Sequence, residues 1–329
     1  MENINNLIPF STIAQRAQWD ANHGYCGETS YIAALMYYGG YMSQYNMREL
    51  VLSFINRNNE NELYNQSDEE SQLLLDSDMI DTMVASALTL SYEKYDGETV
   101  DDFIRWIEKH TNNLVPVVIG VYNSNVLLDN PNNGSDTYDH IVSALSVNDN
   151  LVTIWDNGLG STTTNDIPIM TREDAYNNDS IYAIPNTEPA SLGNWGIAMT
   201  GINLPSECIR LQVTSSDASE PEMIEGSNIP PEGIPITLTI HLYDLEPNTV
   251  YFLYRFNNVT TLPKNTFNKV PNSNFNNTFN KVPNNNFNKN YLSRIGVLVT
   301  TINNPMQNIV TDTINSGDTA IYRCYRNHL

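Results

Sequence analysis

The apolar pattern of this chain changes near Gly201, and this change constrains the fold more than any other feature of the sequence. Upstream of it, segments with helical spacing come first and runs rich in β-branched residues follow. Downstream, short alternating segments such as residues 236–242 are separated by turn residues. Helices followed by an antiparallel sheet predict an α+β domain, and the later segments predict an all-β sandwich. We therefore expect two domains, residues 1–203 and residues 204–329.

Apolar spacing and turn residues give the expected elements. Phe103, Trp106 and Ile107 fall on one side of a helix, and Gly39 and Gly40 are typical helix-ending residues. We predict helices over 28–38, 47–57, 73–88 and 100–109, and strands over 115–122, 138–145, 151–158, 209–213, 236–242, 250–256, 292–301 and 319–325.

Cys26 lies on a turn that contains Gly24 and Gly27, directly before the apolar run 31–38. A thiolate at the start of a helix faces the positive end of the helix dipole, which lowers the thiol pKa and raises the reactive fraction. The alternative is a small buried residue at a helix start, because cysteine is often buried. Cys26 is the candidate nucleophile.

Residues 138–145 and 151–158 read as two strands joined by a short polar turn, which is typical of a β-hairpin. His140 begins the first strand, and Asp156 or Asn157 ends the second. These strand ends are adjacent in an antiparallel hairpin, so a carboxylate or amide there orients the imidazole while its other nitrogen faces a thiol. His140 is the candidate base, Asp156 its orienting partner, and Asn157 the alternative orienter.

Cys26, then His140 more than a hundred residues later, then Asp156 after one hairpin, is an order that resembles papain-like cysteine peptidases. The segment 24–28 is similar to the nucleophile region of that superfamily, closer to its compact bacteriocin-processing branch than to papain itself. The segment 155–158 resembles the part that carries the third catalytic residue, and Gly193-Asn194-Trp195-Gly196-Ile197 is similar to the Trp-Gly segment that follows it.

The resemblance covers about residues 10 to 203 and implies a helix bundle packed on an antiparallel sheet, with the active site between the Cys26 helix and the His140 strand. It implies a hydrolase that cleaves peptide or isopeptide bonds through a Cys-His-Asp triad and a thioester, without a cofactor. Two alternatives stay open. One is a weakly active or inactive binding or adhesion protein on the same frame, and the other is a transglutaminase-type acyl transferase.

One departure from the family pattern concerns the oxyanion donor. The family places a glutamine about six residues before the nucleophile, where this chain has Asp20. Gln18, Gln15 and Asn22 are nearby amides. A side-chain donor together with the backbone N–H of Cys26 stabilises a developing oxyanion by roughly 3–4 kcal/mol. We take Gln18 as the donor, and Asp20 as the feature that favours the inactive alternative.

The remaining histidines and cysteines have less specific surroundings. His23 is close to Cys26 in sequence, but His140 fits the required order better. His110 is expected to be a solvated residue near the end of a helix. Cys208 and Cys324 are two thiols or one bridge, and we favour buried thiols because three cysteines form no disulfide framework.

Composition excludes several classes of partner. The formal net charge is −22 with 16 Lys and Arg, which opposes binding to nucleic acid. No apolar run approaches the ~20 residues of a membrane span. The N-terminus lacks the pattern of a secretory signal, so we expect a cytoplasmic protein, with unconventional export left open. A peptide or protein substrate is the expected partner.

Two loops complete the sequence-based expectations. Residues 129–136 are rich in Asn and Asp, but proline at the third position and His140 at the twelfth do not fit a calcium loop, so no metal site is expected. Residues 265–276 and 277–288 are near-identical Asn-rich repeats, expected to form a mobile loop within the sandwich. Residues 245–251 resemble the turn-and-Tyr element of fibronectin type III-like domains, which indicates a fold but no function.

Overall fold

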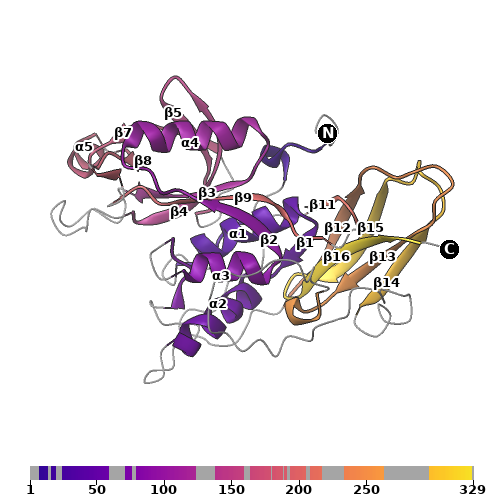
Figure 1. The fold of residues 1–329 in the computed structure, drawn as a ribbon. Coiled ribbons are helices and arrows are strands. Elements are labelled where there is room, and N and C mark those ends of the chain that lie inside the picture. Colours follow the sequence, from indigo (N-terminus) through magenta and orange to yellow (C-terminus); the bar gives the residue numbers. More distant parts are fainter. Residues whose placement is uncertain are drawn as a thin grey trace.

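The computed structural model describes residues 7–13, 16–19, 24–58, 71–75, 79–123, 138–158, 164–178, 180–187, 189–190, 193–204, 208–216, 233–262 and 296–327. They form an α+β fold with mainly antiparallel sheets, which confirms the predicted fold class. Figure 1 shows a large sheet flanked by helices and, beside it, a pair of β-sheets near the C-terminus. Within these ranges, no helix is long and apolar enough to span a bilayer.

The helices begin where capping residues and apolar spacing coincide. The hydroxyl of Thr99 accepts a hydrogen bond from the backbone N–H of Asp102, which caps α4. The predicted helix 73–88 starts only at Ile80, because Asp76-Ser77-Asp78 are residues that favour a helix start over a helix interior. The helices are α1 (Cys26–Tyr37), α2 (Gln44–Asn58), α3 (Ile80–Ala87), α4 (Val100–Asn112) and α5 (Arg172–Asn177), with 3-10 turns η2 (Phe10–Thr12) and η6 (Val259–Thr261).

The larger sheet has the order β2-β9-β3-β4-β5-β6, and β8 pairs with β3 and with β7. Along β3, Val117 and Ile119 pack in the cluster that contains Phe103 of α4, whereas Val118 packs in the cluster around α1. Helix α4 therefore covers one face and α1 the other (Figure 1). The strands are β2 (Leu90–Lys94), β3 (Val117–Asn123), β4 (His140–Asn148), β5 (Leu151–Trp155), β6 (Thr164–Ile167), β7 (Ile169–Met170), β8 (Tyr182–Pro185) and β9 (Gly196–Ile202).

The hairpin predicted around His140 is confirmed as β4 and β5. Asp149 and Asn150 have φ angles of 47° and 67°, the left-handed region that two-residue hairpin turns use. Strand β5 ends at Trp155 rather than at residue 158, so Asp156 and Asn157 follow the strand. Strands β2, β6, β7, β8 and β9 were missing from the sequence prediction. The segments of β2, β6, β7 and β8 are too short to show a periodicity, and the mainly small and apolar residues of β9 do not alternate with polar ones.

The C-terminal part contains two sheets, one with the order β1-β16-β13-β14 plus β10, and one with the order β11-β12-β15. The predicted strands of this part are present, with 209–213 divided between β10 and β11. The sequence prediction missed β1, and it also missed β15. Its alternating residues are largely exposed, which obscures the apolar signal. The strands are β1 (Gly40–Met42), β10 (Cys208–Ile209), β11 (Leu211–Ser215), β12 (Pro235–Leu242), β13 (Tyr251–Phe256), β14 (Val297–Ile302), β15 (Ile309–Asn315) and β16 (Thr319–Arg326).

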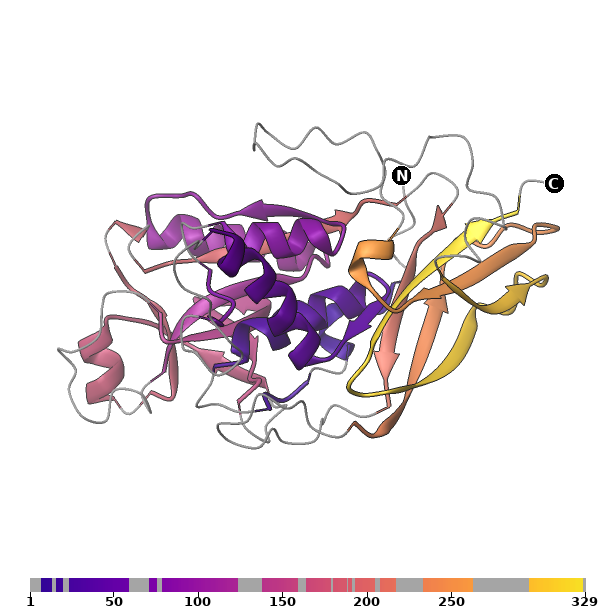
Figure 2. The same ribbon diagram turned by 90° about the horizontal axis from the view of Figure 1, so that it is seen from below.

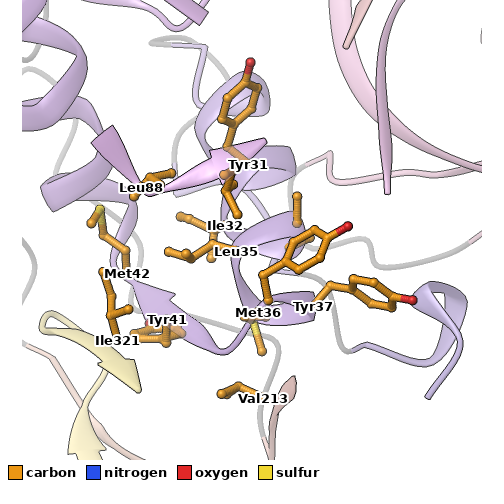
Figure 3. Close-up of a cluster of buried hydrophobic side chains, with 14 of the residues drawn as sticks. Tyr31, Ile32, Leu35, Met36, Tyr37, Tyr41, Met42, Leu88, Val213 and Ile321 are labelled. Atoms are coloured by element: carbon orange, nitrogen blue, oxygen red, sulfur yellow. The ribbon is translucent and has the colours of Figure 1, made fainter. Parts of the chain in front are cut away.

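Packing continues across the predicted domain boundary at residues 203 and 204. Strand β1, from the N-terminal part, pairs with β16 through Gly40↔Ile321. In Figure 3, Leu35 and Met36 of α1 lie in one apolar cluster with Val213 of β11 and Ile321 of β16. Figure 2 shows the sandwich at one end of the molecule, next to these helices. The two-domain division stays a prediction, and the two parts share a core.

Candidate active site

Helix α1 begins at Cys26 and places the thiol against strand β4. The residue after Cys26 has to be glycine, because a Cβ on Gly27 would lie 2.1 Å from the carbonyl oxygen of Leu73. The side chain of Cys26 is 8% exposed, and its thiol is hydrogen-bonded by the backbone of Ile141, the residue after His140. The helix that begins at Cys26 and the strand that begins at His140 therefore meet, as the sequence predicted.

Burial reverses the expected chemistry of the Cys26 thiol. Its pKa is raised to about 11, chiefly by desolvation and to a smaller extent by the nearby Glu28 carboxylate. Hydrogen bonds from the backbone of Ile141 and Gly27 and the charge of Arg48 lower it by less. The prediction of a lowered thiol pKa was wrong, because desolvation of the buried thiol is the largest effect on it. Cys26 is a neutral thiol at pH 7.

His140 is the first residue of β4 and is 6% exposed. It pairs with Val121 of β3, so its side chain starts on the α4 side of the sheet, whereas Ile141 belongs to the cluster around α1. Desolvation lowers the pKa of His140 to about 4, against an opposing effect of the Asp156 carboxylate. Its Nε2 atom is buried and has no hydrogen-bond partner among the described residues.

Asp156 lies close enough to His140 to affect the imidazole pKa, but the Asp156 carboxylate is hydrogen-bonded by other residues. The hydroxyl of Tyr182 donates to Asp156 Oδ1 at 3.0 Å, and the backbone N–H of Gly158 donates to the same oxygen at 2.8 Å. The ring of Tyr182 stacks on the imidazole, with 5.4 Å between the centroids and 16° between the planes. Among the described residues, no hydrogen bond joins Cys26 to His140 or His140 to Asp156.

Asn157 joins α1 to the His140 strand and does not orient the imidazole. Its Nδ2 atom lies 3.0 Å from the carbonyl oxygen of Cys26, 3.0 Å from Ser30 Oγ and 3.1 Å from the carbonyl oxygen of Ile141. Two of these partners are carbonyls, which only accept, so the amide nitrogen must point toward them. The contacts of Asn157 therefore do not support its alternative role as the residue that orients His140.

Gln18 reaches the site through Asn157. Its Nε2 atom donates to Asn157 Oδ1 at 3.3 Å, and its backbone N–H donates to the Asn157 carbonyl at 3.0 Å. The side chain is buried, and one amide hydrogen remains beyond the one given to Asn157. The other residues considered for the oxyanion, Asp20, Gln15 and Asn22, lie outside the described residues, as does His23.

A buried ion pair that the sequence reasoning missed supports the nucleophile turn. Arg48 of α2 donates from Nε to Glu28 Oε1, and both side chains are fully buried. The same guanidinium donates to the carbonyl oxygen of Gly24 at 2.9 Å and lies over the ring of Tyr25, 4.0 Å from its centroid. Acidic residues are common in the first turn of a helix, so the sequence did not mark Glu28 as the partner of a buried ion pair.

Other residues considered from sequence have structural roles or lie outside the described ranges. His110 is buried rather than solvated, because its Nε2 lies 3.1 Å from Glu93 and its ring packs against Trp106. Cys208 and Cys324 form no disulfide, as predicted, although only Cys324 is fully buried. The 129–136 loop and the 265–288 repeats are not among the described residues.

A groove elsewhere on the surface is separate from these residues. It has a volume of about 710 Å³ and lies between the first turn of α4 and the turn end of the β4–β5 hairpin, lined by Thr99, Arg105 and Asn150 among others. His140 and Asp156 occupy the opposite end of that hairpin. Within the described part of the chain, no cluster of three His, Cys, Asp or Glu side chains forms a metal site.

Comparisons of the chain with protein-family models, curated proteins and solved structures find no match. The resemblance to papain-like cysteine peptidases therefore rests on the sequence motifs alone. What the structure adds is the meeting of the Cys26 helix with the His140 strand and the position of Asp156 beyond β5.

The burial of His140 predicts a pH-dependent stability. Its folded pKa of about 4 lies below the unfolded value of 6.5, so the unfolded chain binds more protons between these two values. The free energy of unfolding should therefore fall as pH drops from 7 to 4, by up to about 3 kcal/mol from this residue. Urea unfolding of wild type and His140→Phe at both pH values gives this contribution as the difference, and equal pH dependence in the two proteins would contradict it.

The matched control for this measurement is His241, which is half-buried on β12 and has a pKa lowered by partial desolvation. His241→Gln should remove a smaller part of the acid destabilisation than His140→Phe. A larger effect at position 241 would show that burial of His140 is not the main cause.

Proposed function

We propose that this protein is a thiol-dependent hydrolase that cleaves peptide or isopeptide bonds, with Cys26 as nucleophile, His140 as general base and Asp156 as the group that orients the imidazole. One observation carries the proposal. The thiol at the start of α1 is hydrogen-bonded by the backbone of Ile141, which places it beside the residue that bears the imidazole. The effect of Asp156 on the charge of His140 supports the third role.

The proposed reaction starts from neutral partners. Cys26 holds its proton because burial raises the thiol pKa, and His140 is unprotonated because burial lowers the imidazole pKa. Substrate binding brings the imidazole to the thiol, since catalytic hydrogen bonds often tighten only in the complex. His140 takes the proton from Cys26 as the sulfur attacks the carbonyl carbon, and then protonates the leaving amine. Water, activated by His140, hydrolyses the thioester.

The tetrahedral intermediate needs donors for its oxyanion. The backbone N–H of Cys26 lies in the first turn of α1, where N–H groups have no partner within the helix. Gln18 is the proposed side-chain donor, because it is buried beside Asn157 and keeps one amide hydrogen available. Asn157 links Gln18 to the carbonyl oxygen of Cys26, so a chain of hydrogen bonds joins the proposed side-chain donor to the residue that bears the thiol.

Loss of either member of the proposed pair should abolish turnover. Cys26→Ala and His140→Ala are each expected to lower hydrolysis of a fluorogenic peptide library and of denatured protein by at least about 10³-fold, since each removes a group that acts in the bond-breaking step. Release of fluorescent fragments and peptide mapping by mass measure this. Cys208→Ala, which changes a thiol outside the site, is the control and should keep full activity.

The same assay separates the alternatives. If wild type cleaves no substrate while Cys26 still binds a peptide, the inactive binding protein on a peptidase frame is correct. If added primary amines divert the acyl group from water, the protein is an acyl transferase that uses the same residues. Cys26 is buried. If its thiol stays unreactive when substrate is present, this burial supports the binding protein.

A further inference from the structure

Tyr182 contacts both His140 and Asp156, and no sequence motif singled it out. It lies on β8, which pairs with β3 through Asn123↔Tyr182 beside the start of the His140 strand. Its side chain is 8% exposed. The hydroxyl donates to Asp156 Oδ1, and the ring stacks on the imidazole.

The donor in this hydrogen bond is the phenol. Burial and the neighbouring Asp156 carboxylate raise the pKa of Tyr182, so the hydroxyl keeps its proton at pH 7. Asp156 Oδ1 then accepts from two donors, Tyr182 and the backbone N–H of Gly158. These two donors fix the orientation of the carboxylate and leave Oδ2 as the oxygen open to another donor, yet among the described residues no hydrogen bond joins it to His140.

The stacked ring fixes the imidazole on one side of the sheet. His140 starts on the face that also carries Val121, whereas the thiol of Cys26 is bonded by Ile141, whose side chain faces α1. A parallel arrangement of the two rings at 5.4 Å restricts rotation of the imidazole. Tyr182 thus holds the carboxylate by its hydroxyl and the imidazole by its ring.

We infer that Tyr182 is a positioning residue that controls the pairing of His140 with Asp156 and Cys26, and that it keeps these three groups unpaired in the resting protein. The inference rests on the proposed function for the roles of the three groups. Its test does not require turnover, because the charge state of the imidazole and the reactivity of the thiol are measured directly.

The titratable groups around His140 are few among the described residues. The charge that affects its pKa is that of Asp156, which follows β5. Tyr182 on β8 covers the ring, and Cys26 on α1 interacts electrostatically with Tyr182. Asp139 directly precedes β4, and its Oδ1 accepts hydrogen bonds from two nitrogens of Arg172 on α5. Variants of Tyr182 and Asp156 therefore separate the causes of the shifted His140 pKa.

Tyr182→Phe tests the hydroxyl, because it keeps the ring and removes only the donor to Asp156. We expect the His140 pKa, followed by NMR titration of the assigned imidazole in the full chain, to rise by at least about half a pH unit. Alkylation of Cys26 by iodoacetamide at pH 7, mapped by mass, should become at least about threefold faster as the freed pair draws the thiol proton. Tyr182→Leu also removes the ring and should increase both effects.

Asp156→Asn is the control for the path of the effect. The hydroxyl acts through the carboxylate, so adding Tyr182→Phe to Asp156→Asn should leave the His140 pKa and the alkylation rate unchanged. Equal values in wild type, Tyr182→Phe and Tyr182→Leu, or a fall in either quantity, would overturn the inference. If the expected shifts occur in a protein that hydrolyses no substrate, the proposed function fails and the role of Tyr182 stands. If the protein hydrolyses substrate while the His140 pKa is the same in all variants, the proposed function stands and the role of Tyr182 fails.

Discussion

Replacing Arg48 with methionine should lower the free energy of unfolding by about 3–5 kcal/mol, the usual range when one partner of a buried ion pair is removed. The substitution leaves the Glu28 carboxylate fully buried, with the backbone N–H of Leu73 as its remaining donor among the described residues. It also removes the hydrogen bond to the carbonyl oxygen of Gly24, on the turn that precedes Cys26. Urea unfolding at pH 7 measures the loss.

Two further variants separate charge burial from loss of packing. Adding Glu28→Gln to Arg48→Met removes the unpaired charge and should restore more than half of the lost stability, because a buried pair replaced by neutral groups is often close to neutral. Asp102→Asn at the exposed pair with Arg105 is the surface control, and its unfolding curve should overlay that of wild type. If Arg48→Met costs less than about 1 kcal/mol, water or another group compensates Glu28, and the pair does not support the turn.

Asn157→Leu should lower the free energy of unfolding by on the order of 3 kcal/mol and abolish thiol-dependent activity. The side chain is fully buried, and its loss leaves the carbonyl oxygens of Cys26 and Ile141 without their amide donor. It also removes the acceptor of the Gln18 amide. Because Asn157 joins the thiol helix to the His140 strand, its loss should move the two candidate catalytic groups apart. Urea unfolding and the peptide-hydrolysis assay measure the two effects.

The isosteric variant Asn157→Asp distinguishes hydrogen bonding from volume. It places a carboxylate oxygen where Nδ2 faces two carbonyl oxygens at 3.0 and 3.1 Å, so it should destabilise the protein about as much as leucine does. Asn257→Asp is the control, since Asn257 Oδ1 accepts an exposed hydrogen bond from Arg255 Nε that a carboxylate oxygen also accepts, and a change within about 0.5 kcal/mol is expected there. If Asn157→Asp is about as stable as wild type, the hydrogen bonds of the Asn157 amide do not hold α1 against β4.

The sequence was sufficient for the features that depend on neighbouring residues. The hairpin that carries His140 was predicted because alternating strands flank an Asn- and Asp-rich turn, and Asp149 and Asn150 adopt the left-handed conformation that such a turn requires. Helix α4 was predicted from apolar residues on one side, and the helix after Gly24 was predicted over 28–38, although α1 already begins at Cys26. The α+β fold class followed from the order of these elements.

Tertiary structure alone decided the chemistry of the site. The pKa of Cys26 is raised and that of His140 lowered because both are buried, and burial depends on segments distant in sequence. Asn157 turns toward α1, Tyr182 reaches Asp156 from β8, and β1 joins β16 across the predicted boundary. Local periodicity carries no information on such partners, because desolvation and long-range hydrogen bonds arise only when distant segments pack together.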